Sequence, residues 1–138
     1  MKASELRLGN YINSLGQQFN DENQFKGWDN YVIKVDIDVL KNIFIENKDF
    51  KYSPIPLTEE WLLKFGFEKY LTGFKLSKPI PYTEIKITKK GFYTDTELYD
   101  YELSYNKSNR SILYTSVFYV NQMQNLYFAL TGEELEIK

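Results

Sequence analysis

Histidine and cysteine are both absent from the 138 residues, and arginine occurs only twice, as Arg7 and Arg110. Without cysteine the chain has no disulfide, no thiol nucleophile and no thiolate metal ligand. Without histidine it has no Ser-His-Asp triad and no imidazole ligand. The acid–base groups that remain are Asp, Glu, Lys and Tyr, so enzyme classes that depend on Cys or His are excluded.

Positive charge is also scarce, because 17 basic residues stand against 19 acidic ones and give a formal net charge of −2. Nucleic-acid binding draws its affinity from Lys and Arg placed against phosphates, so this balance disfavours it. No apolar run approaches the roughly 18 residues of a membrane span, and residues 1–10 lack the apolar segment of a signal peptide. We therefore expect a cytoplasmic protein with no membrane partner.

Aromatic residues, by contrast, are abundant at 17%, with 12 Tyr and 10 Phe. Tyrosine is rigid and amphipathic and is enriched at recognition surfaces. Lys, Asn and Ile are frequent too, so the codon bias of an AT-rich genome is an alternative source of the excess. A hydrophobic fraction of 43% at this length predicts one ordinary domain with one core.

A proline connector, residues 54–56, divides the chain, because two prolines one residue apart hold the backbone extended. We expect a β-rich part at 1–53 and an α+β part at 57–138. Each is small, so we expect them to share one core as a single compact domain over 1–138.

The N-terminal part is predicted to be mainly β. We expect a strand at 6–12, a turn at 13–16, a long loop or irregular hairpin at 17–30, and a strand at 31–35. The segment 36–45 is ambiguous, because Ile37, Leu40 and Phe44 have helical spacing whereas residues 43–45 are typical of a strand. We expect a turn followed by a strand there.

The C-terminal part is predicted to begin with a helix over 59–65, capped by Thr58 and ended by Gly66. Its core residues should be Trp61, Leu62 and Phe65.

Strands should follow at 83–88, 98–105 and 111–119, with turns at 89–91 and 106–109. A second helix, capped by Asn121 with Gln124 three residues on, should end at Gly132, before a short edge strand at 135–137. Its core stripe should be Met123, Leu126, Tyr127 and Leu130. The predicted fold class is α+β: a mainly antiparallel β-sheet, with a small barrel-like β part at the N-terminus and two short capped helices packed on it.

Acidic clusters are the strongest candidates for chemistry, but they have structural explanations. Asp36 and Asp38 could hold a hard cation, yet one D-x-D lacks enough ligands, and Asp36 is better placed to cap a turn. The acidic stretch 95–102 follows a basic stretch at 75–90, which favours charge pairing between neighbouring strands. No phosphate-binding loop and no G-x-S-x-G motif occurs, so we assign no catalytic, cofactor-binding or metal-binding residue.

Two exposed segments are the predicted partner-binding sites, the loop 17–30 and the hairpin tip near 107–110. The tyrosines at 99, 101 and 105 alternate with acidic residues and are expected to face the core instead. The predicted site residues are Gln24, Phe25, Lys26, Trp28, Lys107, Asn109 and Arg110.

Three stretches resemble a family of small proteins of phages and prophages of the Bacteroidota. They correspond to the beginning, middle and end of those proteins and are Lys2–Ile12, Pro54–Phe67 and Val120–Leu135. The resemblance implies a non-enzymatic accessory protein that binds and inhibits a host protein or ribonucleoprotein complex in the bacterial cell. It points to an anti-CRISPR-like inhibitor of an anti-phage defence system. An RNA-targeting type VI effector is one target that this context suggests. The alternatives are a nucleic-acid-associated phage module, a structural virion component or an enzyme that uses carboxylates, Lys or Tyr.

Overall fold

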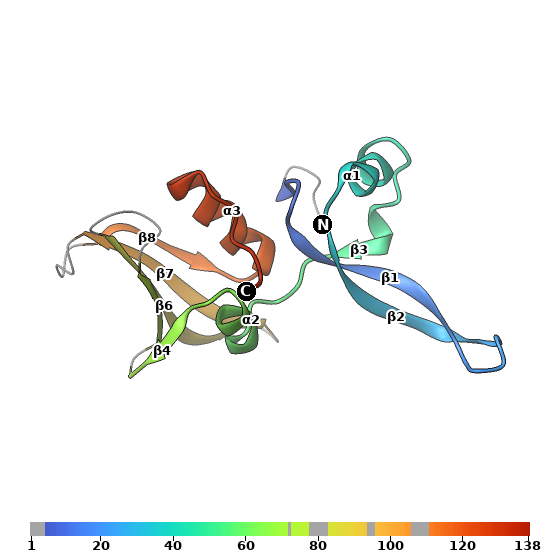
Figure 1. Ribbon diagram of the computed structural model, residues 1–138, viewed down its shortest axis with the longest axis horizontal. Helices are drawn as coiled ribbons and strands as arrows, with labels where there is room; N and C mark the ends of the chain where they lie inside the picture. The colour runs from blue at the N-terminus through green and yellow to red at the C-terminus, as the bar shows by residue number, and fades with distance from the viewer. Residues whose placement is uncertain (1–4, 72, 78–82, 94–95, 106–110) are drawn as a thin grey trace. The chain divides into compact units, whose positions relative to one another are not determined.

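The protein is an α+β chain with antiparallel sheets, which confirms the predicted class. The computed structural model describes residues 5–71, 73–77, 83–93, 96–105 and 111–138 (Figure 1). The chain divides into two compact units, Met1–Ile55 and Pro56–Lys138, so the division falls inside the predicted proline connector. The expectation that both parts share one core stays a prediction. None of the described helices is long and apolar enough to cross a membrane.

The first unit is built on a three-stranded antiparallel sheet in the order β2-β1-β3. Strands β1 (Tyr11–Phe19) and β2 (Phe25–Lys34) form a hairpin, and the short β3 (Tyr52–Ser53) pairs with β1. Among the described residues this sheet is open, with β2 and β3 at its edges, rather than barrel-like.

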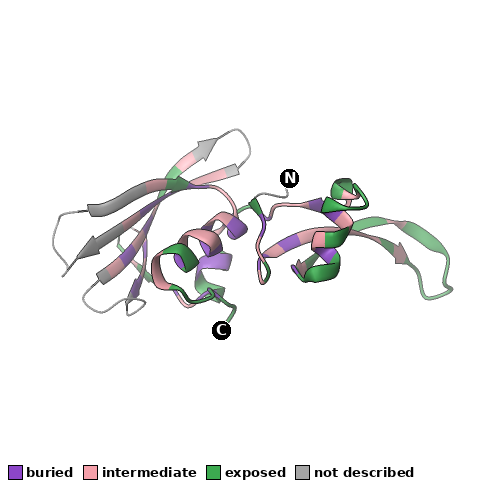
Figure 2. Ribbon diagram, turned by 90° about the horizontal axis from the view of Figure 1, so that it is seen from above, coloured by how far each residue is buried: buried purple, intermediate pink, exposed green. Residues whose placement is uncertain are grey.

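The base of the hairpin, a helix and a short 3-10 turn enclose the core of the first unit. The helix is α1 (Ile37–Phe44) and the 3-10 turn is η2 (Asp49–Lys51). The buried core residues are Leu6, Ile12, Val35, Val39, Ile43 and Tyr52. Beyond this core the hairpin extends as two strands whose outer half is exposed (Figure 2).

The start of β1 differs from the prediction. Residues 6–10 form a turn rather than a strand, because the buried Asn10 accepts a hydrogen bond from the Arg7 amide through Oδ1, at 2.8 Å. The Asn10 carbonyl accepts a second one from the Val35 amide, at 2.7 Å. The predicted turn at 13–16 is also wrong, since continuous pairing with β2 supplies backbone hydrogen bonds along the whole of β1.

Helix α1 corrects the prediction of a turn and strand at 36–45. The Asp36 carboxylate accepts a hydrogen bond from the Val39 amide, at 2.9 Å, and so caps the helix. Val39 and Ile43, four residues apart, face the core. The helical spacing that the sequence left as an alternative is therefore the correct one.

The second unit holds a five-stranded antiparallel sheet with helices α2 (Glu59–Lys64) and α3 (Val120–Thr131) on the same side of it (Figure 1). Buried side chains from that face of the sheet include Ile85, Ile87, Tyr99 and Tyr101. The strands are β4 (Glu68–Tyr70), β5 (Gly73–Ser77), β6 (Thr83–Tyr93), β7 (Thr96–Tyr105) and β8 (Ser111–Val117).

Helix α2 (Glu59–Lys64) has the predicted N-cap and the predicted C-terminal end. Thr58 accepts a hydrogen bond from the Trp61 amide, and Gly66 adopts a left-handed φ of 89°. The Phe67 amide then donates to the Leu62 carbonyl, at 3.0 Å, which completes the Schellman end. The predicted core residues Trp61, Leu62 and Phe65 are all buried.

Helix α3 (Val120–Thr131) ends at Gly132 as predicted but begins earlier than predicted. Its N-cap is Tyr119, and the Gln122 side chain accepts a hydrogen bond from the Tyr119 amide, at 3.2 Å. Asn121 and Gln124, predicted to cap the helix, are buried inside it instead. In the predicted core stripe Met123 and Tyr127 are buried, and Leu126 and Leu130 are half-buried.

Two further expectations for the second unit need correction. The predicted turn at 89–91 is a β-bulge inside β6, where the register with β7 shifts between Lys89 and Gly91. The predicted edge strand at 135–137 forms no ladder, and Gln124 instead fixes this segment by donating to the Leu135 carbonyl, at 3.0 Å. The predicted turn at 106–109 lies outside the described residues.

Candidate partner-binding surface

The β1–β2 hairpin has two faces of different character, because directly paired residues share a face and successive pairs alternate. One face continues from the core. On it the Tyr31 ring covers Gly16, where an added Cβ would lie 2.6 Å from the ring. Further out, Gln18 Nε2 donates to Asp29 Oδ2, at 2.7 Å. We call the opposite side, which faces away from the core, the outer face of the hairpin.

Three aromatic rings occupy the far end of the outer face. Phe19, Phe25 and Trp28 are 55%, 56% and 57% exposed. The ring centroids of Phe19 and Phe25 are 6.2 Å apart and those of Phe25 and Trp28 are 6.0 Å apart, both edge to face. Taking about 200 Å² for an aromatic side chain, the three rings together expose roughly 330 Å². That is already within the range of the largest patch on a typical monomer, which is often functional.

The turn that joins the two strands is ordered by its own side chains. Asn20 Oδ1 accepts hydrogen bonds from the amides of Glu22 and Gln24, at 3.0 and 2.9 Å. The Asn20 amide donates to the Gln24 carbonyl, and Asn23 takes a left-handed φ of 59°, which Asn tolerates well. These hydrogen bonds join the end of β1 to the start of β2 and so order the turn beside the three rings.

The prediction that residues 17–30 lie at the surface is confirmed, since only Gln18 and Gly27 among them are partly covered. Of the predicted site residues there, Gln24 lies in the turn and Lys26 at the bulge of β2, both exposed. Phe25 and Trp28 are brought into ring contact. The predicted residues Lys107, Asn109 and Arg110 lie outside the described residues.

The sequence-based prediction missed Phe19. Its signal was the two-residue alternation that begins at Tyr11, and a turn predicted at 13–16 hid that alternation. In the structure Phe19 pairs with Phe25 directly across the hairpin, which adds the third ring to the patch.

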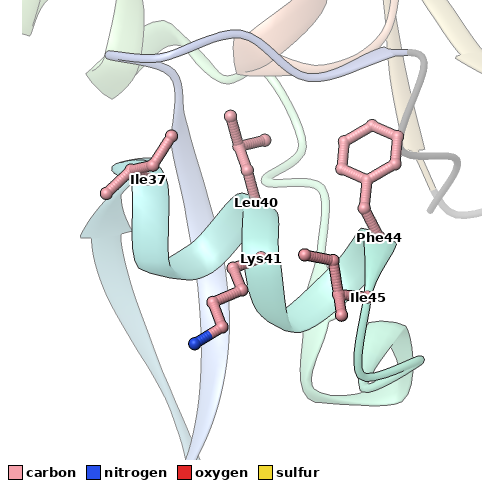
Figure 3. Close-up of a pocket in the computed structure, with 5 residues that line it drawn as sticks. All are labelled: Ile37, Leu40, Lys41, Phe44 and Ile45. Atoms are coloured by element: carbon pink, nitrogen blue, oxygen red, sulfur yellow. The ribbon is translucent and has the colours of Figure 1, made fainter.

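A second exposed apolar surface lies on α1, on the side away from the core. Ile37, Phe44 and Ile45 are 69%, 60% and 71% exposed. With Leu40 and Lys41 they line a shallow depression of about 330 Å³. Figure 3 shows Ile37, Leu40 and Phe44 pointing to one side of the helix and Lys41 pointing away from them. Leu40 also packs against the core of the first unit, so we call the three exposed residues Ile37, Phe44 and Ile45 the outer face of α1.

The acidic clusters have the structural roles that the sequence favoured. Across β6 and β7, Lys89 Nζ is 2.7 Å from Glu97 Oε1, and Lys90 Nζ is 3.6 Å from Asp100 Oδ2. Hydrogen bonds from Lys89 and then from Tyr99 lower the pKa of Glu97. Within the described ranges no group of three acidic residues is arranged to hold a metal ion.

Tyr99 and Tyr101 of β7 belong to the core, as predicted, and are fully buried, whereas the side chain of Tyr105 lies outside what the structure describes. Burial, and then the hydrogen bond to Glu97, raise the pKa of Tyr99.

Comparisons with protein-family models, with characterised proteins and with solved structures found no match.

Proposed function

We propose that the chain is a binding protein without catalytic activity, and that the outer face of the hairpin is its docking surface for another protein. The observation that carries the proposal is the triad of touching, half-exposed rings of Phe19, Phe25 and Trp28. Aromatic anchors of this kind supply much of the binding energy at protein interfaces.

The order of the hairpin supports the same reading. The rings are mounted on paired strands and on a turn closed by Asn20, so docking costs little conformational entropy. Lys26 and Asp29 are the charged residues next to the rings in sequence, one of each sign, and the chain has a net charge of −2. An aromatic patch without a basic surround suits a protein surface better than a phosphate backbone.

The identity of the partner is a finer proposal, and it rests on the resemblance to phage and prophage proteins. On that ground we propose that the partner is a host protein or ribonucleoprotein complex of the bacterial cytoplasm that belongs to anti-phage defence. The chain would then act as an inhibitor by occupying a surface of that complex.

The test is quantitative capture from the bacterial host with a tagged chain, followed by mass spectrometry. Wild type should retain a stoichiometric partner, and Phe25→Ala/Trp28→Ala should retain far less of it. Loss of a central aromatic anchor weakens binding by about 30-fold or more. Leu71→Ala is the matched control, because Leu71 is an exposed apolar residue of the other unit.

Equal capture by all three proteins, or no stoichiometric partner for wild type, would contradict the proposal. Treatment of the captured complex with nuclease distinguishes a nucleic-acid ligand. If nuclease releases the partner, and raised salt without nuclease releases it too, the nucleic-acid alternative is correct.

A further inference from the structure

The edge of β2 that faces away from β1 is a row of backbone groups with no strand beside it. β2 is the outermost strand of its sheet, and β1 is its only strand neighbour among the described residues. Every residue from Trp28 to Val32 is exposed, so both faces of this stretch are open. We propose that the partner adds an extended strand of its own to this free edge, an inference that rests on the proposed function of the hairpin.

Hydrogen bonds at the base of the hairpin show which backbone groups point outward. The Val35 amide donates to the Asn10 carbonyl, at 2.7 Å, and the Val35 carbonyl accepts from the Gly9 amide, at 2.9 Å. In an antiparallel pair, alternate residues turn their backbone groups toward the same neighbour. The register is regular along this stretch. The residues of the exposed stretch whose amides and carbonyls point away from β1 are therefore Trp28, Asn30 and Val32.

The Asn30 amide supports this assignment independently. It donates to Asp29 Oδ1, at 2.8 Å, rather than to a carbonyl of β1. The same carboxylate accepts from Gln18 Nε2 through Oδ2, at 2.7 Å, on the core-facing side of the hairpin. In the part of the chain that the structure describes, the amides of Trp28 and Val32 have no such acceptor, so they are the open donors of the edge.

Open donors and acceptors in this pattern fit an extended chain. Each outward residue offers one amide and one carbonyl, and outward residues repeat at about 6.8 Å along a strand. An added strand matches this repeat with its own alternate residues, which is how peptides are bound at exposed sheet edges. A helix bonds its backbone groups internally and cannot match the repeat.

The middle of β2 lacks most of the devices that normally protect a sheet edge. No proline occurs in β2, and the bulge of the hairpin lies at its far end. The two lysines, Lys26 and Lys34, lie near the ends of the strand, and the Asp29 carboxylate is engaged by Gln18. The added strand is therefore expected to pair with residues 28–32.

The side chains of the edge define the chemistry of the incoming strand. Trp28 and Val32, 57% and 53% exposed, lie on the outer face of the hairpin on either side of Asn30. Directly opposed residues of neighbouring strands bring their Cβ atoms to about 4.5–5.5 Å, where aromatic and β-branched side chains pair well. We expect such residues opposite Trp28 and Val32. Because Trp28 also contacts Phe25, a partner that covers the rings already lies beside this edge.

The experiment is amide hydrogen exchange of the full chain, free and in the complex captured from the host, resolved to single residues by mass spectrometry. In the free chain the outward amides of Trp28 and Val32 should exchange much faster than the Tyr31 amide, which faces β1. In the complex their exchange should slow at least about tenfold, because each then donates to the added strand. The Leu71 amide, in the other unit, is the internal reference.

A proline at an outward position tests the main chain apart from the side chain. Val32→Pro removes an outward amide, and proline is tolerated in an edge strand where the amide faces solvent. Val32→Ala is the matched control, since it shortens the side chain and keeps the amide. We expect Val32→Pro to weaken the complex at least about tenfold more than Val32→Ala does. Circular dichroism checks that both variants fold, and the exchange measurement on wild type needs neither of them.

The outcomes separate this proposal from the proposed function. If capture depends on the rings but the outward amides exchange as fast in the complex as in the free chain, strand addition is wrong and the docking surface stands. Equal weakening by Val32→Pro and Val32→Ala leads to the same conclusion. Slow exchange of these amides in the free chain that depends on its concentration would show a second copy at the edge and overturn the proposal. A wild-type chain that retains no stoichiometric partner would overturn both proposals.

Discussion

Two neighbouring tyrosines of β7 should respond in opposite ways to the loss of a hydroxyl group. Tyr99 and Tyr101 are both fully buried, and both face the core side of the same strand. The Tyr99 hydroxyl donates to Glu97 Oε2, at 2.6 Å. The Tyr101 hydroxyl has no hydrogen-bond partner among the described residues, and burial raises the pKa of Tyr101.

The magnitudes follow from the partners. A hydrogen bond to a charged group contributes about 1.5–3 kcal/mol. Glu97 keeps its ion pair with Lys89 when Tyr99 is changed, so we expect Tyr99→Phe to lower the free energy of unfolding by about 1.5 kcal/mol. Tyr101→Phe removes a buried polar atom that forms no bond there, so we expect a change between zero and a gain of about 1 kcal/mol.

The assay is urea unfolding followed by tryptophan fluorescence. Trp28 and Trp61 lie one in each unit, so a Trp28→Phe background makes the signal report on the second unit alone. Equal slopes for both variants are required for the comparison of midpoints. If Tyr101→Phe destabilises the unit as much as Tyr99→Phe does, the Tyr101 hydroxyl is bonded in solution and the reasoning is refuted.

Three further changes test other parts of the structure. Asp36→Ala removes the N-cap of α1 and should lower the free energy of unfolding by about 1 kcal/mol in urea, with Asp38→Ala, which caps nothing in the structure, as the control. Gly73→Ala should cost about 2–4 kcal/mol, because a Cβ there would collide with the Ile87 carbonyl oxygen, and an unchanged melting temperature would contradict this. The lowered pKa of Glu97 means that its ionised form is favoured in the folded state, so its contribution is present above about pH 4.5 and lost as the pH falls further. The stability difference between wild type and Glu97→Gln should therefore shrink on acidification below that value, and a difference that is constant with pH would contradict it.

Elements fixed by local interactions were predictable from the sequence. The start and end of α2 depend on Thr58, Gly66 and Phe67, which are all within three residues of the helix. The end of α3 at Gly132 is of the same kind, since its left-handed φ of 73° suits glycine.

Elements that depend on distant partners were not predictable. The segment 36–45 becomes a helix because Val39 and Ile43 find a core made by β1 and β3, and short apolar runs alone do not decide between helix and strand. Lys89 and Gly91 were predicted to form a turn, but pairing with β7 on both sides turns the interruption into a bulge.

In the candidate site, too, local features were predictable from the sequence and long-range contacts were not. Exposure of Phe25 and Trp28 followed from the polar, turn-rich sequence around them. The contact of Phe25 with Phe19 required the hairpin register, which depends on the pairing of β1 with β2. The outer face of α1 escaped prediction because the helix itself did.

Hydroxyl-radical footprinting of the captured complex, read out by mass spectrometry, tests the central claim most directly. It compares the solvent exposure of Phe19, Phe25 and Trp28 in the free chain and in the complex, with exposed Leu71 as the internal reference. We predict that the three rings become protected while Leu71 does not. Rings that remain as reactive in the complex as in the free chain would contradict the claim that the hairpin is the docking surface.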